Sequence, residues 1–228
     1  MSKIHENLIN ILIWSVAFLM PACVLAQAEG FLQVTVPEYS GPLTVSPESY
    51  PQLAAHRTQA FLDLNSMGYI EEEYLVSGNA NVYEWAVDGS GSVKIPAAPY
   101  TTRILIRRPV DPGRFSGNVI VETLNNARQY DWAFVWALSY DYIVNSGDVF
   151  VAVTHSPDGI GVLKNFDSLR YASLTLANPA PMETCGPDNS TSASEEGLKW
   201  DLISQIGVLL RSETGPLAGF EVKSLVAT

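Results

Sequence analysis

Residues 117–154 constrain the fold of this chain more than any other stretch. Two short runs within it, residues 119–121 and 149–153, are continuously apolar and rich in β-branched side chains, which is typical of strands covered on both faces in a parallel sheet. Between them, apolar residues recur at helical spacing up to Gly147, a favourable left-handed helix cap: Trp132, Val135, Trp136, Tyr140, Ile143 and Val144. Strand, crossover helix and strand predict a βαβ unit, and therefore an α/β layer.

Two asparagines follow the first of these strands, and a histidine follows the second. Asn125 and Asn126 open the turn before the helix, and His155 comes directly after Thr154. In open α/β sheets ligands bind at the carboxyl edge of the strands, so all three residues are candidates for a site there. Either asparagine side chain is also a good helix N-cap, and that alternative stays open.

The composition excludes several functional classes. The chain has 228 residues, 47% hydrophobic and 16% charged, with a formal net charge of −11, which suits one globular domain. Such a charge repels nucleic acid and anionic lipid, so we expect neither as a partner. Two cysteines and three histidines are too few for a zinc site, and no complete nucleotide-binding motif is present. We therefore expect no metal and no cofactor.

The first residues have the pattern of an export signal. Lys3 precedes a largely apolar run at residues 8–20, and Pro21 and small residues follow. This pattern predicts a signal peptide over residues 1–26, with cleavage after Ala26 or Ala28, and a folded domain over residues 27–228. A retained membrane anchor is the alternative, but the run is shorter than the roughly 20 residues that a span needs. We expect a secreted or periplasmic protein without a stable membrane anchor, in which Cys185 is the remaining cysteine.

The chain before residue 117 is expected to be antiparallel. The patterns predict an edge strand at residues 31–36, a helix at 52–64, a hairpin of strands 80–87 and 93–95, and a strand at 100–108 with Arg103 and Arg107 on one face. Glu71, Glu72 and Glu73 are consecutive and cannot converge on one ion, because neighbouring strand residues face opposite ways. We interpret them as a solvated strand end.

Three further segments complete the prediction. Residues 155–159 are read as a turn, and residues 179–194 as a polar loop with a glycosylation acceptor at Asn189. A helix is expected at 195–212, and residues 220–227 are a third buried-strand candidate.

Several strings, in this order, resemble a family of exported α/β-hydrolase domain proteins: Pro99-Tyr-Thr-Thr-Arg103 to Pro109, Asn118-Val-Ile-Val-Glu122 to Asn125, Asp131-Trp-Ala133, Phe166-Asp167 with Arg170-Tyr171, and Asp201 to Gly207. The resemblance covers residues 69–228. It implies the N-terminal half of an α/β-hydrolase fold, with antiparallel first strands followed by parallel strands and crossover helices. The chain is then expected to be a truncated form of that fold.

The resemblance also implies a site. In such hydrolases the strand corresponding to residues 222–228 leads into a Gly-x-Ser-x-Ser/Gly nucleophile turn, and the acid and histidine of the triad follow in sequence. No Gly-x-Ser-x-Gly occurs in residues 1–228, so the triad is expected beyond Thr228 and this chain alone is expected to be inactive. One oxyanion-hole N–H comes from the loop after the third strand, which here is Leu124, Asn125 or Asn126, with Asn125 preferred.

The function implied by this resemblance is hydrolysis of a small-molecule carboxylic ester by a secreted or periplasmic serine hydrolase. His155 and Arg170 are candidate substrate-binding residues, although Arg170 is better suited to fixing the segment that contains it. The alternative is an exported binding or structural protein on a hydrolase-like scaffold. The patterns leave the oligomeric state open.

Overall fold

The structure is a computed structural model that describes residues 34–58, 61–85, 87–126, 130–177 and 196–228. The expected signal peptide, Cys185 and the acceptor at Asn189 lie outside these residues. Within the described ranges, no helix is both long and apolar enough to cross a membrane.

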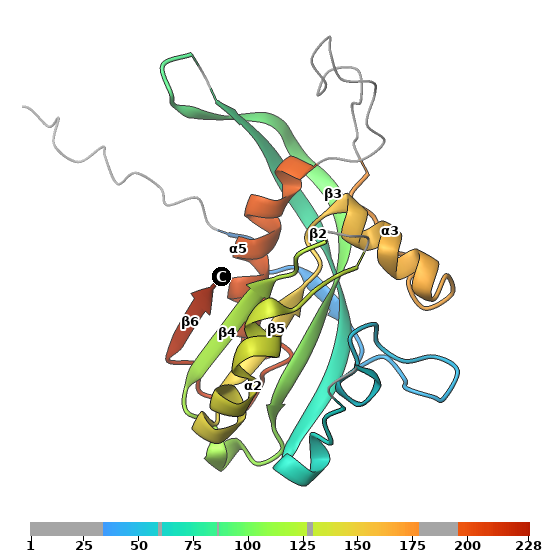
Figure 1. The fold of residues 1–228 in the computed structure, drawn as a ribbon. Coiled ribbons are helices and arrows are strands. Elements are labelled where there is room, and N and C mark those ends of the chain that lie inside the picture. Colours follow the sequence, from blue (N-terminus) through green and yellow to red (C-terminus); the bar gives the residue numbers. More distant parts are fainter. Residues whose placement is uncertain (1–33, 59–60, 86, 127–129, 178–195) are drawn as a thin grey trace, which may run out of the picture. The chain divides into compact units, whose positions relative to one another are not determined.

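The described residues form a mixed six-stranded sheet in the order β1-β2-β3-β5-β4-β6 (Figure 1). Its strands are β1 (Glu38–Ser40), β2 (Tyr69–Trp85), β3 (Gly91–Pro109), β4 (Asn118–Thr123), β5 (Val149–Val153) and β6 (Ser224–Ala227). The pairs β1–β2, β2–β3 and β3–β5 are antiparallel, whereas β4 pairs in parallel with both β5 and β6. The predicted change from antiparallel to parallel pairing is therefore confirmed.

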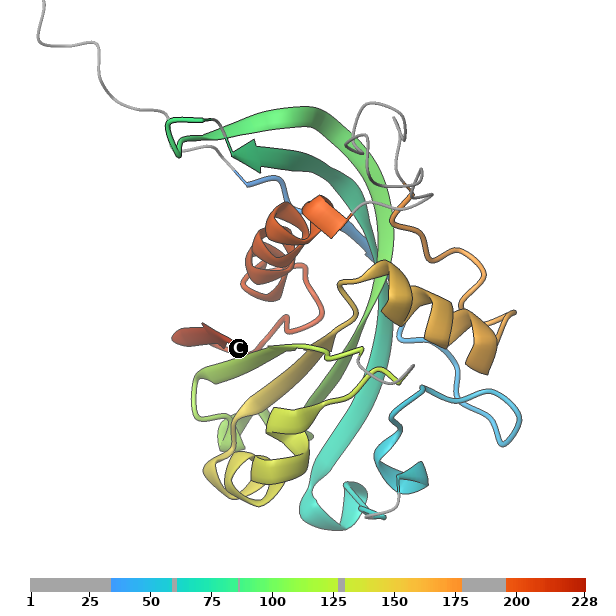
Figure 2. The ribbon, with the colours of Figure 1, turned by 45° about the horizontal axis from the view of Figure 1, so that its top comes forward.

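β2 and β3 form one long hairpin. The structure joins the separately predicted strands at 80–87, 93–95 and 100–108 into these two strands, which pair from Tyr69 opposite Pro109 to Trp85 opposite Gly91. Figure 2 shows the hairpin curving around the helix α5 (Lys199–Leu210). Because the sheet bends there, the apolar face of α5 packs into its concave side, with Leu202, Ile206 and Leu209 buried.

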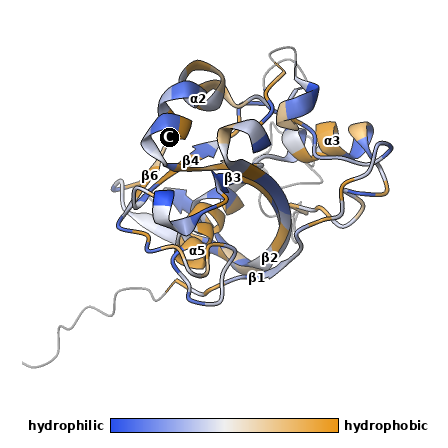
Figure 3. Ribbon diagram, turned by 90° about the horizontal axis from the view of Figure 1, so that it is seen from below, coloured by the Kyte–Doolittle hydropathy of each residue, from blue (hydrophilic) through white to orange (hydrophobic). Residues whose placement is uncertain are grey.

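The predicted βαβ unit is confirmed as β4, α2 (Phe134–Ser146) and β5. All five residues of β5 are buried, as their uninterrupted apolar pattern predicts. Figure 3 shows α2 on one side of the sheet and α5 on the other. Two buried clusters correspond to these sides: Ile104 and Ile106 of β3 belong to the cluster of α5, and Leu105 to the cluster of α2.

Gly147 ends α2 in the left-handed conformation, with φ +75°. A Cβ at this position would lie 2.1 Å from the carbonyl oxygen of Arg114. We expect Gly147→Ala to lower the free energy of unfolding by more than the roughly 1–2 kcal/mol that left-handed backbone costs an alanine, because the clash adds to it. Urea unfolding monitored by circular dichroism measures the change.

The control for this substitution is Gly161→Ala within α3 (Pro157–Phe166). Nothing lies within 4 Å of a Cβ at Gly161, and alanine is the better helix former by roughly 1 kcal/mol. A Gly147→Ala protein as stable as the Gly161→Ala protein would show that the cap geometry is wrong.

Three local predictions fail. The described residues 52–58 and 61–64 contain one short 3₁₀ turn, Ala55–Arg57, instead of a helix. The edge strand is β1 at Glu38–Ser40, and residues 34–37 are not strand, while residues 31–33 lie outside the described ranges. Residues 155–159 are not an isolated turn, because α3 begins at Pro157 with the Ser156 hydroxyl accepting from the Gly159 N–H. Serine before proline is a helix-start signal that the turn interpretation overlooked.

The helix at 195–212 and the strand at 220–227 are both present in shorter form. The helix consists of a 3₁₀ turn at Glu196–Leu198 followed by α5. The strand is β6, which is only partly buried and lies at the edge of the described sheet beside β4. Its residues are therefore less buried than those of β5.

Candidate functional site

The three parallel strands end at the same edge of the sheet, and most of the predicted site residues follow them there. Thr123 pairs with Val153 at the ends of β4 and β5. Leu124, Asn125 and Asn126 continue from β4, and the half-exposed His155 is the second residue after β5. The sequence prediction thus placed these four residues at one edge correctly. Their catalytic or binding roles stay predictions.

The backbone amides of Leu124, Asn125 and Asn126 differ in their hydrogen-bond partners. The Leu124 N–H donates to the Val153 carbonyl at 3.0 Å, and the Asn125 N–H donates to the Trp132 carbonyl at 3.0 Å. Asn125 and Trp132 form a small antiparallel bridge. No hydrogen bond from the Asn126 N–H is found within the part of the chain that is described. Of the three loop amides, that of Asn126 is thus the one without an acceptor among the described residues.

The end of β6 lies against the start of the same loop. The Thr123 N–H and hydroxyl both donate to the Thr228 carbonyl, at 3.1 and 2.8 Å, and the Thr228 N–H donates to the Val121 carbonyl at 2.9 Å. Thr228 is thus bonded to the residue that directly precedes Leu124.

A buried ion pair fixes the far side of this loop. Asp131 is 1% exposed, and its Oδ2 lies 3.3 Å from Nη2 of the fully buried Arg103 on β3. The Thr154 hydroxyl, at the end of β5, donates to the same Oδ2 at 2.6 Å and accepts from Arg103 Nε at 3.1 Å. These three side chains connect the loop to two strands, so they restrict how the loop can move.

Arg103 also connects to a second buried carboxylate, Glu73 of β2. Its Nη1 lies 3.5 Å from Glu73 Oε1, which also accepts from the Tyr171 hydroxyl at 2.8 Å. Arg170 Nε donates to Glu73 Oε2 at 2.6 Å, and its Nη1 donates to the Thr44 carbonyl at 2.7 Å. Arg170 therefore fixes the segment after α3 onto β2, which agrees with the structural role considered for it.

The three consecutive glutamates are not a solvated strand end. Glu71 pairs with Arg107 at 2.8 Å and Glu72 with Arg108 at 2.9 Å, while Glu73 is 1% exposed. They do face opposite ways in alternation, as strand geometry requires. The prediction failed because it treated the carboxylates without the arginines of the neighbouring strand, which neutralise them.

Glu122, near the end of β4, caps the helix that follows the loop. Its carboxylate oxygens accept from the Val135 and Trp136 N–H groups at 2.9 and 3.2 Å. Burial raises the pKa of the Glu122 carboxyl, while these amide hydrogen bonds act in the opposite direction. The capping role that the sequence left open for Asn125 or Asn126 is filled here by a residue that sequence reasoning missed.

A family model described as an alpha/beta hydrolase domain matches residues 39–228. The chain belongs to this alpha/beta hydrolase domain family. Searches of curated proteins and of solved structures find no match. The family assignment confirms the resemblance and the predicted α/β fold class.

No group of three or more acidic, histidine or cysteine side chains that could hold a metal ion occurs in the described ranges. The buried polar residues around Arg103 hold the neighbouring loops in place.

Proposed function

We propose that this hydrolase domain belongs to a secreted or periplasmic serine hydrolase that cleaves small-molecule carboxylic esters. Its nucleophilic serine stands in a sharp turn directly after β6, and the acid and histidine of the triad follow in the order usual for such folds. The loop after β4 provides one of the two oxyanion N–H groups, and the residue after the serine provides the other.

One observation carries this proposal: the hydrogen bonds between Thr228 and Thr123. Because β6 runs parallel to β4 and is in register with it, a residue that follows Thr228 emerges beside Leu124, Asn125 and Asn126. A serine there and an amide of this loop can therefore approach the same carbonyl group, as acyl transfer requires.

Asn126 is the donor that we assign within the loop. Its amide makes no hydrogen bond to the other described residues, whereas the amides of Leu124 and Asn125 are engaged. An oxyanion donor has to be free of competing acceptors while its backbone is held still. The bridge between Asn125 and Trp132, which follows β4 closely, holds the residue that directly precedes Asn126.

Labelling with a fluorophosphonate, which reacts with activated serines, tests this proposal. We expect the complete gene product to be labelled, and labelling to disappear when the serine of the turn after β6 is replaced by alanine. Residues 1–228 alone should not be labelled, since they contain no Gly-x-Ser-x-Gly turn. If the complete product stays unlabelled and cleaves no p-nitrophenyl ester, the exported binding or structural alternative replaces the enzyme.

Export is the second part of the proposal, and it is motivated by the pattern of residues 1–26. Mass spectrometry of the protein from its native source should find a mature N-terminus at Gln27 or Glu29. An intact N-terminus at Met1 would contradict export through a cleaved signal.

A further inference from the structure

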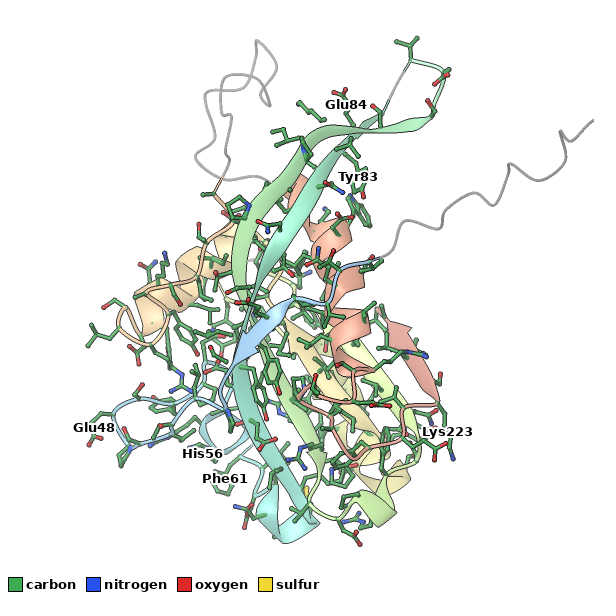
Figure 4. The ribbon with its side chains drawn as sticks, turned by 180° about the vertical axis from the view of Figure 1, so that it is seen from behind. Glu48, His56, Phe61, Tyr83, Glu84 and Lys223 are labelled. Carbon is green, nitrogen blue, oxygen red and sulfur yellow. The ribbon has the colours of Figure 1, made fainter. Side chains whose placement is uncertain are left out.

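A cavity of about 480 Å³ lies between the first turns of α2 and four residues from an earlier part of the chain, Leu53, Arg57, Thr58 and Leu62. This volume is within the range of small-molecule binding sites, roughly 300–1,000 Å³. Figure 4 labels His56 and Phe61, the sequence neighbours of the lining residues Arg57 and Leu62. Asn126 is not among the described lining residues, whereas Tyr130 and Trp132, farther along the same loop, are.

The walls of the cavity are mostly aromatic and aliphatic. Tyr130 and Trp132 come from the loop before α2, and Trp136 and Tyr140 from α2 itself. The Tyr130 and Trp132 rings lie 4.8 Å apart, and both side chains are partly exposed. Aromatic surfaces arranged in this way favour a flat, apolar ligand that stacks or packs edge to face.

The charged part of the lining is entirely cationic. Among the described residues, Arg57 and Arg107 are the charged side chains at the cavity, in a chain whose net charge is −11. The Arg107 charge is balanced by Glu71 at 2.8 Å. Arg57 is exposed, its guanidinium carbon lies 4.7 Å from the centre of the Tyr50 ring, and no ion pair of Arg57 is found in the described ranges. An exposed cation at an apolar cavity, with no ion pair to the other described residues, favours an anion.

Arg107 adds a second, independent observation. Its side chain is 1% exposed, Nε binds Glu71, and Nη2 donates to the Leu53 carbonyl at 2.6 Å, but Nη1 has no hydrogen-bond partner. A buried N–H without an acceptor costs about 1–3 kcal/mol. An acidic ligand group at this wall, after a small shift of the guanidinium group, supplies the missing acceptor.

We propose that this cavity binds a small aromatic monocarboxylate, with the ring among Trp132, Trp136 and Leu62 and the carboxylate held by the arginines. The inference does not depend on ester hydrolysis, because it uses neither the oxyanion loop amides nor a nucleophile.

Tryptophan fluorescence titration of the purified complete gene product tests the proposal, since Trp132 and Trp136 line the cavity. Phenylacetate is the probe, phenylacetamide is its neutral counterpart of the same shape, and acetate carries the charge without the ring. We expect saturable quenching by phenylacetate in the millimolar range or below, affinity at least about tenfold lower for phenylacetamide, and no saturation by acetate.

Two substitutions place the binding in this cavity. Arg57→Gln removes an exposed cation and should weaken phenylacetate binding about tenfold without changing phenylacetamide binding. Ala137→Phe, at an exposed position of α2 that lines the cavity, should fill the space and abolish both. Arg211→Gln is the matched control, because it removes one exposed cation at the end of α5, outside the cavity lining.

Three results would overturn the proposal. They are equal affinities for phenylacetate and phenylacetamide, equal effects of Arg57→Gln and Arg211→Gln, and absence of saturable quenching by phenylacetate. None of these results bears on labelling of the complete gene product by a fluorophosphonate, so the two proposals can fail separately.

Discussion

Replacing Arg103 by methionine is expected to lower the free energy of unfolding by about 3–5 kcal/mol, the usual effect of removing one partner from a buried ion pair. The guanidinium group is fully buried and lies between Glu73 and Asp131. Methionine retains most of the side-chain length but leaves Asp131 without its cation and Glu73 with Arg170 alone. Chemical unfolding in urea, followed by circular dichroism, measures the loss.

Arg108→Met is the matched control for this prediction. Arg108 lies on the same strand and pairs with Glu72 at 2.9 Å, but the two side chains are 17% and 19% exposed. Pairs that solvent reaches contribute about 0–1 kcal/mol, so the control should lose little stability. If both substitutions have the same small effect, the buried cluster around Arg103 does not stabilise the domain.

The Arg103→Met protein should also show a local change at the candidate site. Asp131 belongs to the loop that continues to Trp132, whose carbonyl accepts from the Asn125 N–H. Without Arg103, the loop loses an anchor, and the Asn125 amide should exchange its hydrogen with solvent faster than in the Arg108→Met protein. Hydrogen exchange measured by mass spectrometry on the peptide that contains Asn125 detects this change.

The sequence predicted the βαβ unit well because each of its parts has a strong local signal. The run at Val149–Val153 is apolar throughout, and Gly147 has the backbone freedom that the end of α2 requires. These signals act within a few residues and do not depend on distant partners. The same holds for α5, whose apolar spacing matches the face that is buried.

The predicted helix at residues 52–64 failed because distant side chains compete for its backbone groups. The carbonyls of Gln52 and Leu53 accept from Arg103 and Arg107, and the Ala55 N–H donates to the Glu71 carboxylate. A helix over residues 52–64 would need these two carbonyls as acceptors for its own first turn. Apolar spacing alone does not reveal such competition, since the partners are distant in sequence.

The polar cluster around Arg103 was missed for a related reason. Successive side chains of a strand point to opposite faces, so residues two or four apart share a face. This rule placed Arg103 and Arg107 on one face of β3, and it also places Glu71 and Glu73 on one face of β2. The missing information was the register of the hairpin, which sets Glu71 opposite Arg107. Acidic and basic residues that alternate on two strands joined by a turn are a signal that could have predicted the pairs.

Replacing Asn126 by proline in the complete gene product is expected to lower kcat for ester hydrolysis by about 10²–10³-fold, the usual effect of removing one oxyanion-hole donor. Proline has no backbone N–H, so it removes the assigned donor itself. The preceding residue, Asn125, is held in an extended bridge with Trp132, a conformation that a following proline favours.

Asn126→Ala separates the role of the backbone from that of the side chain. Alanine keeps the N–H, so this protein should retain most of the activity while losing any capping or binding role of the amide side chain. Removal of a donor used only in the transition state lowers kcat and leaves KM nearly unchanged. If proline and alanine lower kcat equally, or if the loss falls on KM alone, the oxyanion contact is made by another amide of the loop, and the bridge between Asn125 and Trp132 must open for catalysis.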